Sequence, residues 1–573
     1  MSTTAIDSHS THSAHEHHEH KLNFWQKYVF SVDHKVIGIQ FLFTTLFFFF
    51  VGGLLALLLR WQLAYPGKPM PVLGQVFPDS MMVGGIMLPE FYNSLFTMHA
   101  SVMIFFAIIP ILVGAFGNFV VPLQIGAGDM AFPRLNMLSY WFFWPAAVVA
   151  LSGFFLQGGA AATGWTAYPP VSVLEPIGQT MWIIAVILVG TSSIMGALNY
   201  LTTILNMRAP GMGFFQMPLT TWSIFITSVL SLLATPVLTS VMIMLLFDRT
   251  LGTHFFLSEG GGHALLFQHM FWFYSHPAVY IMILPGMGIV SDVISTFSRK
   301  PLFGYHAMIY AIMGIAFLGF IVWGHHMFQS GMNPLVGTSF MVSTMLIAVP
   351  SAIKTFNWLG TMWRGSIRFT TPMLNAIAFV SMFVIGGLSG IFMASTPVDI
   401  FITDTYFIVG HIHYVLFGGS MFAAFAGISY WFPKMFGRQL NDFLGKLHFV
   451  GTFIFFNCTF FPMHILGVGG HMRRIYDPMQ YAHLQHMQPI NVFITWSAYL
   501  LGLWQLILVF NFVKSLFWGR PADRNPWQSN TLEWVAPSPP PHGNFETIPT
   551  VYHGPYEYNV PGKSRDWQPQ NEK

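Results

Sequence analysis

The sequence is poor in charged residues. Asp, Glu, Lys and Arg make up only 8% of its 573 residues, whereas about a quarter of the residues are charged in soluble globular proteins. Hydrophobic residues account for 54% and aromatic residues for 17%. The formal net charge of +3 is small and its basic residues are scattered, which excludes a nucleic-acid partner. This composition indicates a polytopic protein embedded in a lipid bilayer.

Cysteine is almost absent, since Cys458 is the only one and lies within an apolar run. A packed thiol is the expected role of Cys458. Disulfides, thiolate-ligated iron–sulfur clusters and c-type haem attachment all need more cysteines. The chain instead contains 24 histidines. Because imidazole binds iron and copper well, metal chemistry is the leading hypothesis.

The chain divides into a membrane core and two polar ends. Residues 1–30 are polar and rich in histidine, with no apolar core of a signal peptide, and predict a disordered tail. Residues 518–573 are rich in proline, amides and charge, and predict an extended tail able to lie on a partner. Residues 31–517 predict an all-α bundle of twelve transmembrane helices, because glycine-rich connections and the lack of alternating polarity disfavour a barrel. The runs able to span a bilayer core of roughly 30 Å are 35–62, 93–122, 136–158, 178–205, 219–247, 265–295, 305–328, 336–362, 371–394, 404–432, 445–468 and 488–516.

The distribution of basic residues predicts the orientation of the bundle. Cytoplasmic loops of membrane proteins carry an excess of Lys and Arg. With the N-terminus inside, the outer loops contain only Arg60, Lys68, Arg249, Arg473 and Arg474. The inner loops contain Lys21, Lys27, Lys35, Arg134, Arg208, Arg299, Lys300, Arg364, Arg368, Lys434, Arg438 and Lys446. Both termini are therefore predicted to be cytoplasmic.

Two histidines, His411 and His413, begin the tenth apolar segment. Imidazoles buried in hydrocarbon indicate a functional site by default. Residues two apart on a helix point about 200° away from each other, so one helix could serve two cofactors with one histidine each. The alternative is two core histidines satisfied by hydrogen bonds. His99 lies at a similar depth in the second segment, which allows a haem between His99 and His413. Arg473 and Arg474, in an outer loop, could pair with haem propionates or act as interfacial anchors.

A second group of histidines is divided between the sixth and seventh segments. His276 and Tyr280, four residues apart, share one helix face. His325 and His326 close the seventh segment near the same outer side. Three imidazoles could bind one copper ion and leave a coordination position open. Adjacent histidines at a membrane end can also be merely interfacial.

Two ionisable residues lie toward the predicted cytoplasmic side. Lys354, in the eighth segment, either snorkels to the interface or belongs to a proton path. Asp129 lies in an inner loop with Asn118 and Asn136 nearby, and a salt bridge to Arg134 is the structural alternative.

Together these motifs resemble the haem–copper oxidase superfamily, and within it subunit I of cytochrome c oxidase, over roughly residues 25 to 517. The resemblance implies that His99 and His413 are axial ligands of a low-spin haem. It also implies that His411 is the proximal ligand of a high-spin haem. The implied copper ligands are His276, His325 and His326. Tyr280 matches the family's tyrosine that is cross-linked to a copper-binding histidine and gives an electron and a proton to oxygen.

The resemblance also implies two proton channels. Lys354 with Ser291 and Ser351 is similar to one, and Asp129 with Asn118 and Asn136 is similar to the mouth of the other. Arg60 matches the arginine that faces the formyl group of a low-spin haem A. Arg473 and Arg474 match the pair that binds the propionates.

Two positions depart from the family pattern. Ala278 stands where many members have a glutamate that relays protons from the Asp129 channel. The pair Tyr274-Ser275 resembles a known bacterial branch, and we expect the Tyr274 hydroxyl with waters to restore the path. Thr403 precedes Asp404 where the family commonly has a histidine that helps to hold magnesium, which leaves a magnesium site open.

The implied function is a terminal oxidase of the bacterial inner membrane that reduces O2 to water and pumps protons. Electrons would come from cytochrome c, soluble or membrane-bound, and the implied partners are oxidase subunits II and III and a respiratory supercomplex. Cys458 alone cannot build a two-thiolate copper centre, so another subunit must supply the electron entry. A quinol oxidase of the same fold is the nearest rival. Tyr280 and Lys354 argue against a nitric oxide reductase, and a cofactor-free transporter would leave the histidines unexplained.

Overall fold

The computed structural model describes residues 23–573, mostly as helices. Within this range, eleven helices are long and apolar enough to cross a membrane. Residues 1–22 of the predicted N-terminal tail lie outside the described part. The spans are α1 (His34–Ala64), the rod Pro89–Ile125 that contains α2 (Pro89–Ser101) and α3 (Asn118–Ile125), α4 (Pro133–Ser152) with its last turn to Phe155, α6 (Ile177–Asn206), α7 (Leu219–Thr250), α8 (Ala264–Ser298), α10 (Pro334–Leu346) with α11 (Ala348–Met362), α12 (Thr371–Ala394), α14 (Tyr406–Val415) with α15 (Phe422–Phe436), α16 (Asp442–Val468), and α17 (Gln488–Trp518) with the preceding turn from Ala482.

The predicted seventh span is shorter than expected. Its regular helix, α9 (Tyr305–Gly319), has 15 residues, and a separate 3-10 turn follows at Trp323–Met327. Gly319 ends α9 against the ring of Tyr280, because a Cβ atom at Gly319 would lie 2.9 Å from Tyr280 Cδ2. The all-α membrane bundle is confirmed, whereas the twelfth span stays a prediction.

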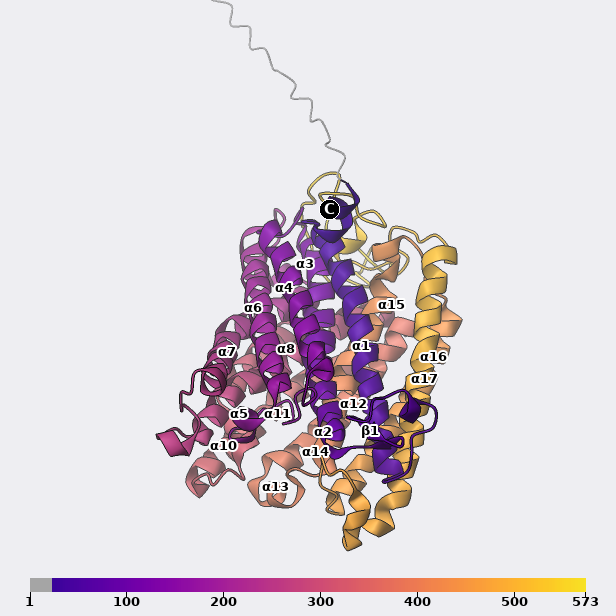
Figure 1. Cartoon of the computed structure of the whole chain (residues 1–573). Helices are drawn as coiled ribbons and strands as arrows, with labels where there is room; N and C mark the ends of the chain where they lie inside the picture. The colour runs from indigo at the N-terminus through magenta and orange to yellow at the C-terminus, as the bar shows by residue number, and fades with distance from the viewer. Residues whose placement is uncertain (1–22) are drawn as a thin grey trace, which may run out of the picture.

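Short elements connect the spans on the side of the bundle where α2 and α14 begin (Figure 1). They are α5 (Val171–Leu174), α13 (Thr396–Ile402) and an antiparallel hairpin of β1 (Met82–Val83) and β2 (Ile86–Met87). At the opposite end, the start of α1 lies near the C-terminus (Figure 1). The two ends of the described chain therefore share one side of the bundle.

Three rods form the centre of the bundle. In Pro89–Ile125, in α8 and in Tyr406–Phe436, 83–89% of the most apolar stretch is buried, compared with 6–44% in the other spans. Two of these rods contain wide π-type turns, at Val102–Ile108 and Leu416–Met421. Such turns occur frequently at functional sites. Each begins three residues after a histidine of interest, His99 or His413.

The last 55 residues, 519–573, fold back across the end of the bundle, and we call them the C-terminal strap (Figure 1). The strap has no long helix, yet Leu532, Glu533 and Trp534 are almost completely buried. Asp566 of the strap pairs with Arg299 at the end of α8. The strap thus packs on this chain's own bundle, where the sequence predicted an extended tail able to lie on a partner.

Candidate metal centre

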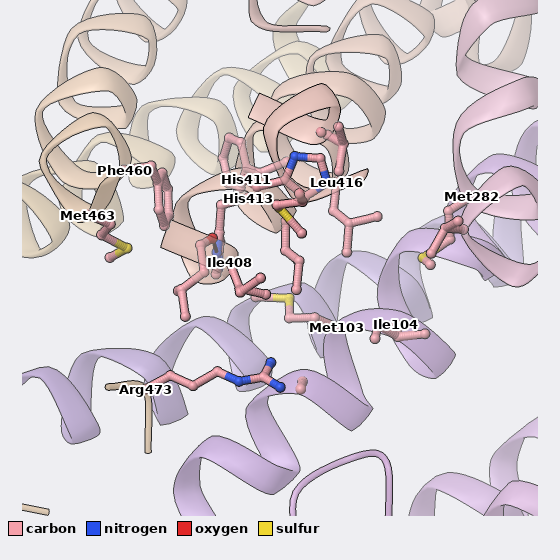
Figure 2. Close-up of a pocket in the computed structure, with 18 of the residues that line it drawn as sticks. Met103, Ile104, Met282, Ile408, His411, His413, Leu416, Phe460, Met463 and Arg473 are labelled. Atoms are coloured by element: carbon pink, nitrogen blue, oxygen red, sulfur yellow. Dashed lines mark hydrogen bonds between the residues drawn. The ribbon is translucent and has the colours of Figure 1, made fainter. Parts of the chain in front are cut away.

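A large apolar cavity of about 1590 Å³ lies between the central rods, on the side of α2 and α14. It exceeds the usual volume of a small-molecule site, about 300–1,000 Å³. Figure 2 shows His411 and His413 on one helix at the edge of the cavity, with Arg473 reaching in from the other side of the view. The predicted site residues that line the cavity are His99, His276, His325, His326, His411, His413, Tyr280, Arg60, Arg473, Arg474 and Ser351.

His99 and His413 face each other across part of this cavity. Their rings are nearly parallel, at 7°, with centroids 6.1 Å apart. This separation is too long for ring stacking, but it suits two imidazoles that bind one metal ion from opposite sides at about 2 Å each. His99 Nδ1 donates to the Gly52 carbonyl at 2.8 Å, and His413 Nδ1 donates to the Val409 carbonyl at 2.8 Å. These bonds leave both Nε2 lone pairs available for a metal.

His276, His325 and His326 form the only group of three or more metal-binding side chains found among residues 23–573. His276 Nδ1 lies 3.2 Å from His326 Nε2, which lies 3.1 Å from His325 Nε2. Three nitrogens this close are well placed to share one ion, since imidazole–metal bonds are about 2 Å long. The geometry therefore suits a metal ion.

Two neighbours, absent from the sequence prediction, orient this trio. Thr344 accepts a hydrogen bond from His325 Nδ1 at 3.0 Å, which directs His325 Nε2 toward the other two rings. Trp272 stacks on His326 at 3.8 Å, with ring planes 9° apart. Tyr280 lies on the same face of α8 as His276, with ring centroids 4.8 Å apart.

His411 faces the cavity from the other side of α14. Its Nδ1 donates to the Gly386 carbonyl at 2.9 Å and approaches Ser389 Oγ at 3.0 Å. These contacts from α12 fix the imidazole tautomer and leave Nε2 free for a ligand. Gly390 is needed for close approach, because a Cβ atom there would lie 3.0 Å from His411 Cε1. Neither Ser389 nor Gly390 could be predicted from the sequence, since small residues are common in membrane helices.

Three arginines line the cavity with different partners. Arg60 is buried and donates to Thr495 Oγ1 at 3.1 Å and to the Asn491 carbonyl at 2.9 Å. Arg473 forms an ion pair with Asp404. Burial, followed by the charge of Arg473, lowers the pKa of Arg474 to about 10. At that pKa Arg474 stays cationic near neutral pH, so the cavity can attract carboxylates.

Among the described residues, Asp404 is not grouped with other side chains that could bind a metal ion. One of its carboxylate oxygens is bound by Arg473 Nε at 2.8 Å, and Thr403 offers no imidazole. The magnesium site therefore has no support from this arrangement.

Lys354 is completely buried beside the cavity, and its ammonium has no hydrogen-bond partner within the described chain. The ammonium lies 5.3 Å from the ring centroid of Trp358, whose Nε1 donates to Ser291 Oγ at 2.9 Å. Ser351 lines the cavity three residues before Lys354. The Lys354 side chain does not reach the membrane interface, so a role as a snorkelling lysine has no support from its position.

Asp129 and its predicted neighbours lie at the strap end of the bundle, away from the cavity. No Asp129–Arg134 ion pair forms among the described residues. Asn118 Oδ1 and Asn136 Nδ2 are buried without protein partners in that range. Buried amides of this kind are commonly satisfied by internal water.

The structure also places His34 and Asn544 beside Asn118. His34 donates from Nδ1 to the Asn118 carbonyl at 2.7 Å, and Asn544 of the strap binds the other ring nitrogen. Sequence reasoning missed both, because Asn544 lies in a segment predicted to be separate.

Tyr274 and Ser275 are buried in α8 next to His276, and Tyr274 lies one turn before Ala278. Ser275 Oγ has no partner in the described structure. Neither residue lines the cavity itself.

A membrane-spanning bundle with a paired-imidazole site, a three-imidazole site and a large apolar cavity is typical of membrane enzymes that carry haem and copper. The model for "Cytochrome C and Quinol oxidase polypeptide I" matches residues 36–500. The chain therefore belongs to the family of haem–copper oxidase catalytic subunits, which are oxidoreductases with haem and copper cofactors.

Individual relatives agree with this assignment. The chain is 50% identical over 540 residues to cytochrome c oxidase subunit 1 of Synechocystis sp., covering 94% of this chain and 93% of the relative. It is 43% identical over 568 residues to alternative cytochrome c oxidase subunit 1 of Bradyrhizobium diazoefficiens, covering 96% and 94%. A solved structure described as a heme-copper terminal oxidase dimer shares the fold, with a TM-score of 0.70 at 18% identity, covering 86% of this chain and 85% of that one.

Proposed function

We propose that this chain is the catalytic subunit of a terminal respiratory oxidase that reduces O2 to water with electrons from cytochrome c and pumps protons. The observation that carries the proposal is the position of α14. On one face of α14, the ring centroid of His413 lies 6.1 Å from that of His99. His411 lines the same cavity as His276, His325 and His326, which we call the copper trio. One helix could thus hold two haems at a fixed position relative to each other.

The proposed ligand roles follow from which nitrogens are free. His99 and His413 would bind a low-spin haem and His411 a high-spin haem, all through Nε2. His276, His325 and His326 would bind copper. When bound, these groups supply electron transfer and the reduction of oxygen. Two haems of type A fit the position of Arg60 on the cavity wall, and Arg473 and Arg474 would bind propionates through charge-assisted bonds.

The residues around the copper trio orient it and supply protons. Thr344 and Trp272 fix two of its rings. Tyr280, beside His276, would give a proton and an electron to oxygen. Gly386 and Ser389 hold the His411 ring, which keeps its Nε2 directed into the cavity.

Two proton pathways would start at the strap end of the bundle. Lys354 with Ser291 and Ser351 would carry protons toward Tyr280, because an unpartnered buried ammonium is a suitable relay. Asp129, Asn118 and Asn136 would form the mouth of the other pathway. Tyr274 and Ser275 would replace the glutamate that is absent at Ala278. Each charge moved against the membrane potential costs about 2.3 kcal/mol per 100 mV.

Electron entry from cytochrome c requires a copper centre that this chain cannot build. Cys458 is the only cysteine, so a two-thiolate copper centre must come from another subunit. We propose subunits II and III as partners within a bacterial inner membrane, with both termini in the cytoplasm, and a respiratory supercomplex as the larger assembly. A quinol oxidase of the same fold is the second candidate, since the matched family includes quinol oxidases.

The test is oxygen uptake by the purified complex with reduced cytochrome c or with a quinol as the only donor. Uptake with cytochrome c, and proton release from vesicles, are expected. Lys354→Met should slow turnover, whereas Lys300→Met, whose ammonium donates to the Gly360 carbonyl at 3.1 Å, should not. Uptake only with quinol would favour the second candidate. A metal-loaded complex that consumes oxygen with neither donor would refute the proposal.

A further inference from the structure

A second group of buried acids lies far from the metal cavity, where the C-terminal strap crosses the bundle. Asp292 comes from α8 and Glu533 from the strap, and both are almost fully buried. Gln124 of α3 lies between them: its side-chain NH2 donates to Asp292 Oδ2 at 3.1 Å and to Glu533 Oε1 at 3.2 Å. One amide group therefore connects two buried carboxyl groups.

The two acids have unequal hydrogen-bond partners. Asp292 accepts hydrogen bonds from the hydroxyl of Tyr556, from the hydroxyl of Thr220 at 2.7 Å and from the side-chain amide of Gln124. Three donors stabilise an ionised carboxylate. The side chain of Glu533 accepts a hydrogen bond from the Gln124 amide and a long one of 3.4 Å from Trp431 Nε1, both at Oε1. Glu533 Oε2 is buried and has no partner in the described chain.

The charges that face the pair do not neutralise two carboxylates. Lys434 is a buried cation beside the strap, and its ammonium donates only to backbone carbonyls, including that of Ala536 at 2.6 Å. One ammonium offsets one negative charge. Two buried carboxylates joined by one amide repel each other strongly if both are ionised. The other titratable groups that face the pair are Tyr305 and Tyr556 beside Asp292 and Tyr430 beside Glu533, with Tyr558 next to Tyr430 and Arg524 next to Lys434.

We propose that Glu533 and Asp292 form a proton-binding site shared by the strap and the bundle, in which Glu533 holds the proton and Asp292 is ionised. The unpartnered Oε2 atom is the position for this proton, because Asp292 accepts from three donors whereas both donors to the Glu533 side chain lie at Oε1. Loss of the proton would leave two facing carboxylates. The strap would then dock less firmly, so proton binding and docking are coupled.

Burial, followed by the charge of Asp292, raises the pKa of Glu533 to about 7. Protonation of Glu533 is therefore expected to change across neutral pH. This property does not depend on the oxidase reaction, so the site can be tested even if the proposed electron donor is wrong.

Infrared difference spectra of the purified complex at stepped pH test the proposal. A protonated carboxylic acid has a carbonyl stretching band apart from the amide bands. In the wild type this band should lose intensity as the pH rises through neutrality. Glu533→Gln should remove it. Glu572→Gln, which alters an exposed strap carboxylate paired with Arg565, should leave it unchanged.

The variant Asp292→Asn shows which of the two acids holds the proton. Removing the charge of Asp292 should leave the band present but shift its titration midpoint to lower pH. If Asp292→Asn abolishes the band and Glu533→Gln retains it, the proton belongs to Asp292 and the proposal is wrong. Should Glu533→Gln fail to assemble, an unchanged midpoint in Asp292→Asn would overturn the proposal by itself.

Discussion

The contact between Arg299 and Asp566 gives a quantitative prediction for docking of the C-terminal strap. Arg299 Nε and Nη2 each donate to one oxygen of Asp566 at 2.8 Å. The Arg299 side chain is 2% exposed and that of Asp566 is 38% exposed. These hydrogen bonds from Arg299 lower the pKa of Asp566, so the pair is ionised at neutral pH. We expect Asp566→Asn to weaken the contact without changing its shape.

The magnitude follows from the number and exposure of the bonds. Charge-assisted hydrogen bonds contribute about 1.5–3 kcal/mol each when buried. Because solvent screens the exposed part of Asp566, we assign about 2 kcal/mol to the pair. Since about 1.4 kcal/mol is a factor of ten, strap opening should rise about 30-fold.

Hydrogen exchange by mass spectrometry measures this opening. The amide of Val551 in the strap donates to the Pro210 carbonyl, in the loop between α6 and α7, at 2.9 Å, so exchange of its peptide reports undocking. Asp566→Asn should accelerate this exchange about 30-fold at low salt, and less at high salt, where charges are screened. Glu572→Gln breaks an exposed pair expected to be worth less than about 1 kcal/mol. Equal exchange in Asp566→Asn and the wild type, or an equal effect of both variants, would refute the reasoning.

Three further predictions concern pH and the metal ligands. Because the pKa of Glu533 is raised from 4.5 to about 7, the folded strap binds more protons than the undocked one between these values. Protection of the strap amides against hydrogen exchange, corrected for intrinsic exchange, should be greatest below pH 4.5. It should fall by at most about 3 kcal/mol as the pH rises through about 7. Glu533→Gln should abolish this trend. Gly390→Ala should displace the His411 ring, which lies 3.0 Å from the added carbon, and reduce high-spin haem content, measured by the carbon monoxide difference spectrum. Thr344→Val should remove the hydrogen bond to His325 and lower copper affinity about 10–100-fold, measured as metal content after chelator treatment.

Matched variants serve as controls for these predictions. Gly410→Ala places a carbon 2.9 Å from His464, which does not line the cavity, so the carbon monoxide spectrum should be unchanged. Thr338→Val alters an exposed hydroxyl of α10 that bonds only to the Pro334 carbonyl, and copper should be retained. Equal losses in a control and its test variant would show that the effect is general destabilisation. Strap protection that rises with pH would contradict the assignment of Glu533.

The sequence allowed the histidine groups to be predicted because polar residues are conspicuous in apolar segments. His99 and His413 could be matched by counting along two helices, and α14 does carry His411 and His413 on different faces. The spacing of His276 and Tyr280 likewise required only one helical turn. Residue depth in a membrane helix follows from position in the chain, and this is why the candidate ligands could be grouped.

Other features depend on contacts that position along the chain does not reveal. Ser389 and Thr344 are ordinary small residues until packing places them against imidazoles. Asp292 lies in a predicted span, but its partner Glu533 comes from a tail predicted to be extended. The run 305–328 is mostly apolar, and its composition does not reveal that α9 ends at Gly319, before the turn that contains His325 and His326.

The reduced-minus-oxidised optical spectrum of the purified complex, with haem and copper quantified per chain, tests the central claim most directly. The account predicts two haems and one copper associated with this chain. In His413→Ala the low-spin haem bands should disappear while copper is retained, because the copper trio lies on α8 and the turn after α9. Absence of haem bands in the wild type, or an unchanged low-spin spectrum in His413→Ala, would contradict the assignment of α14 as the helix between two haems.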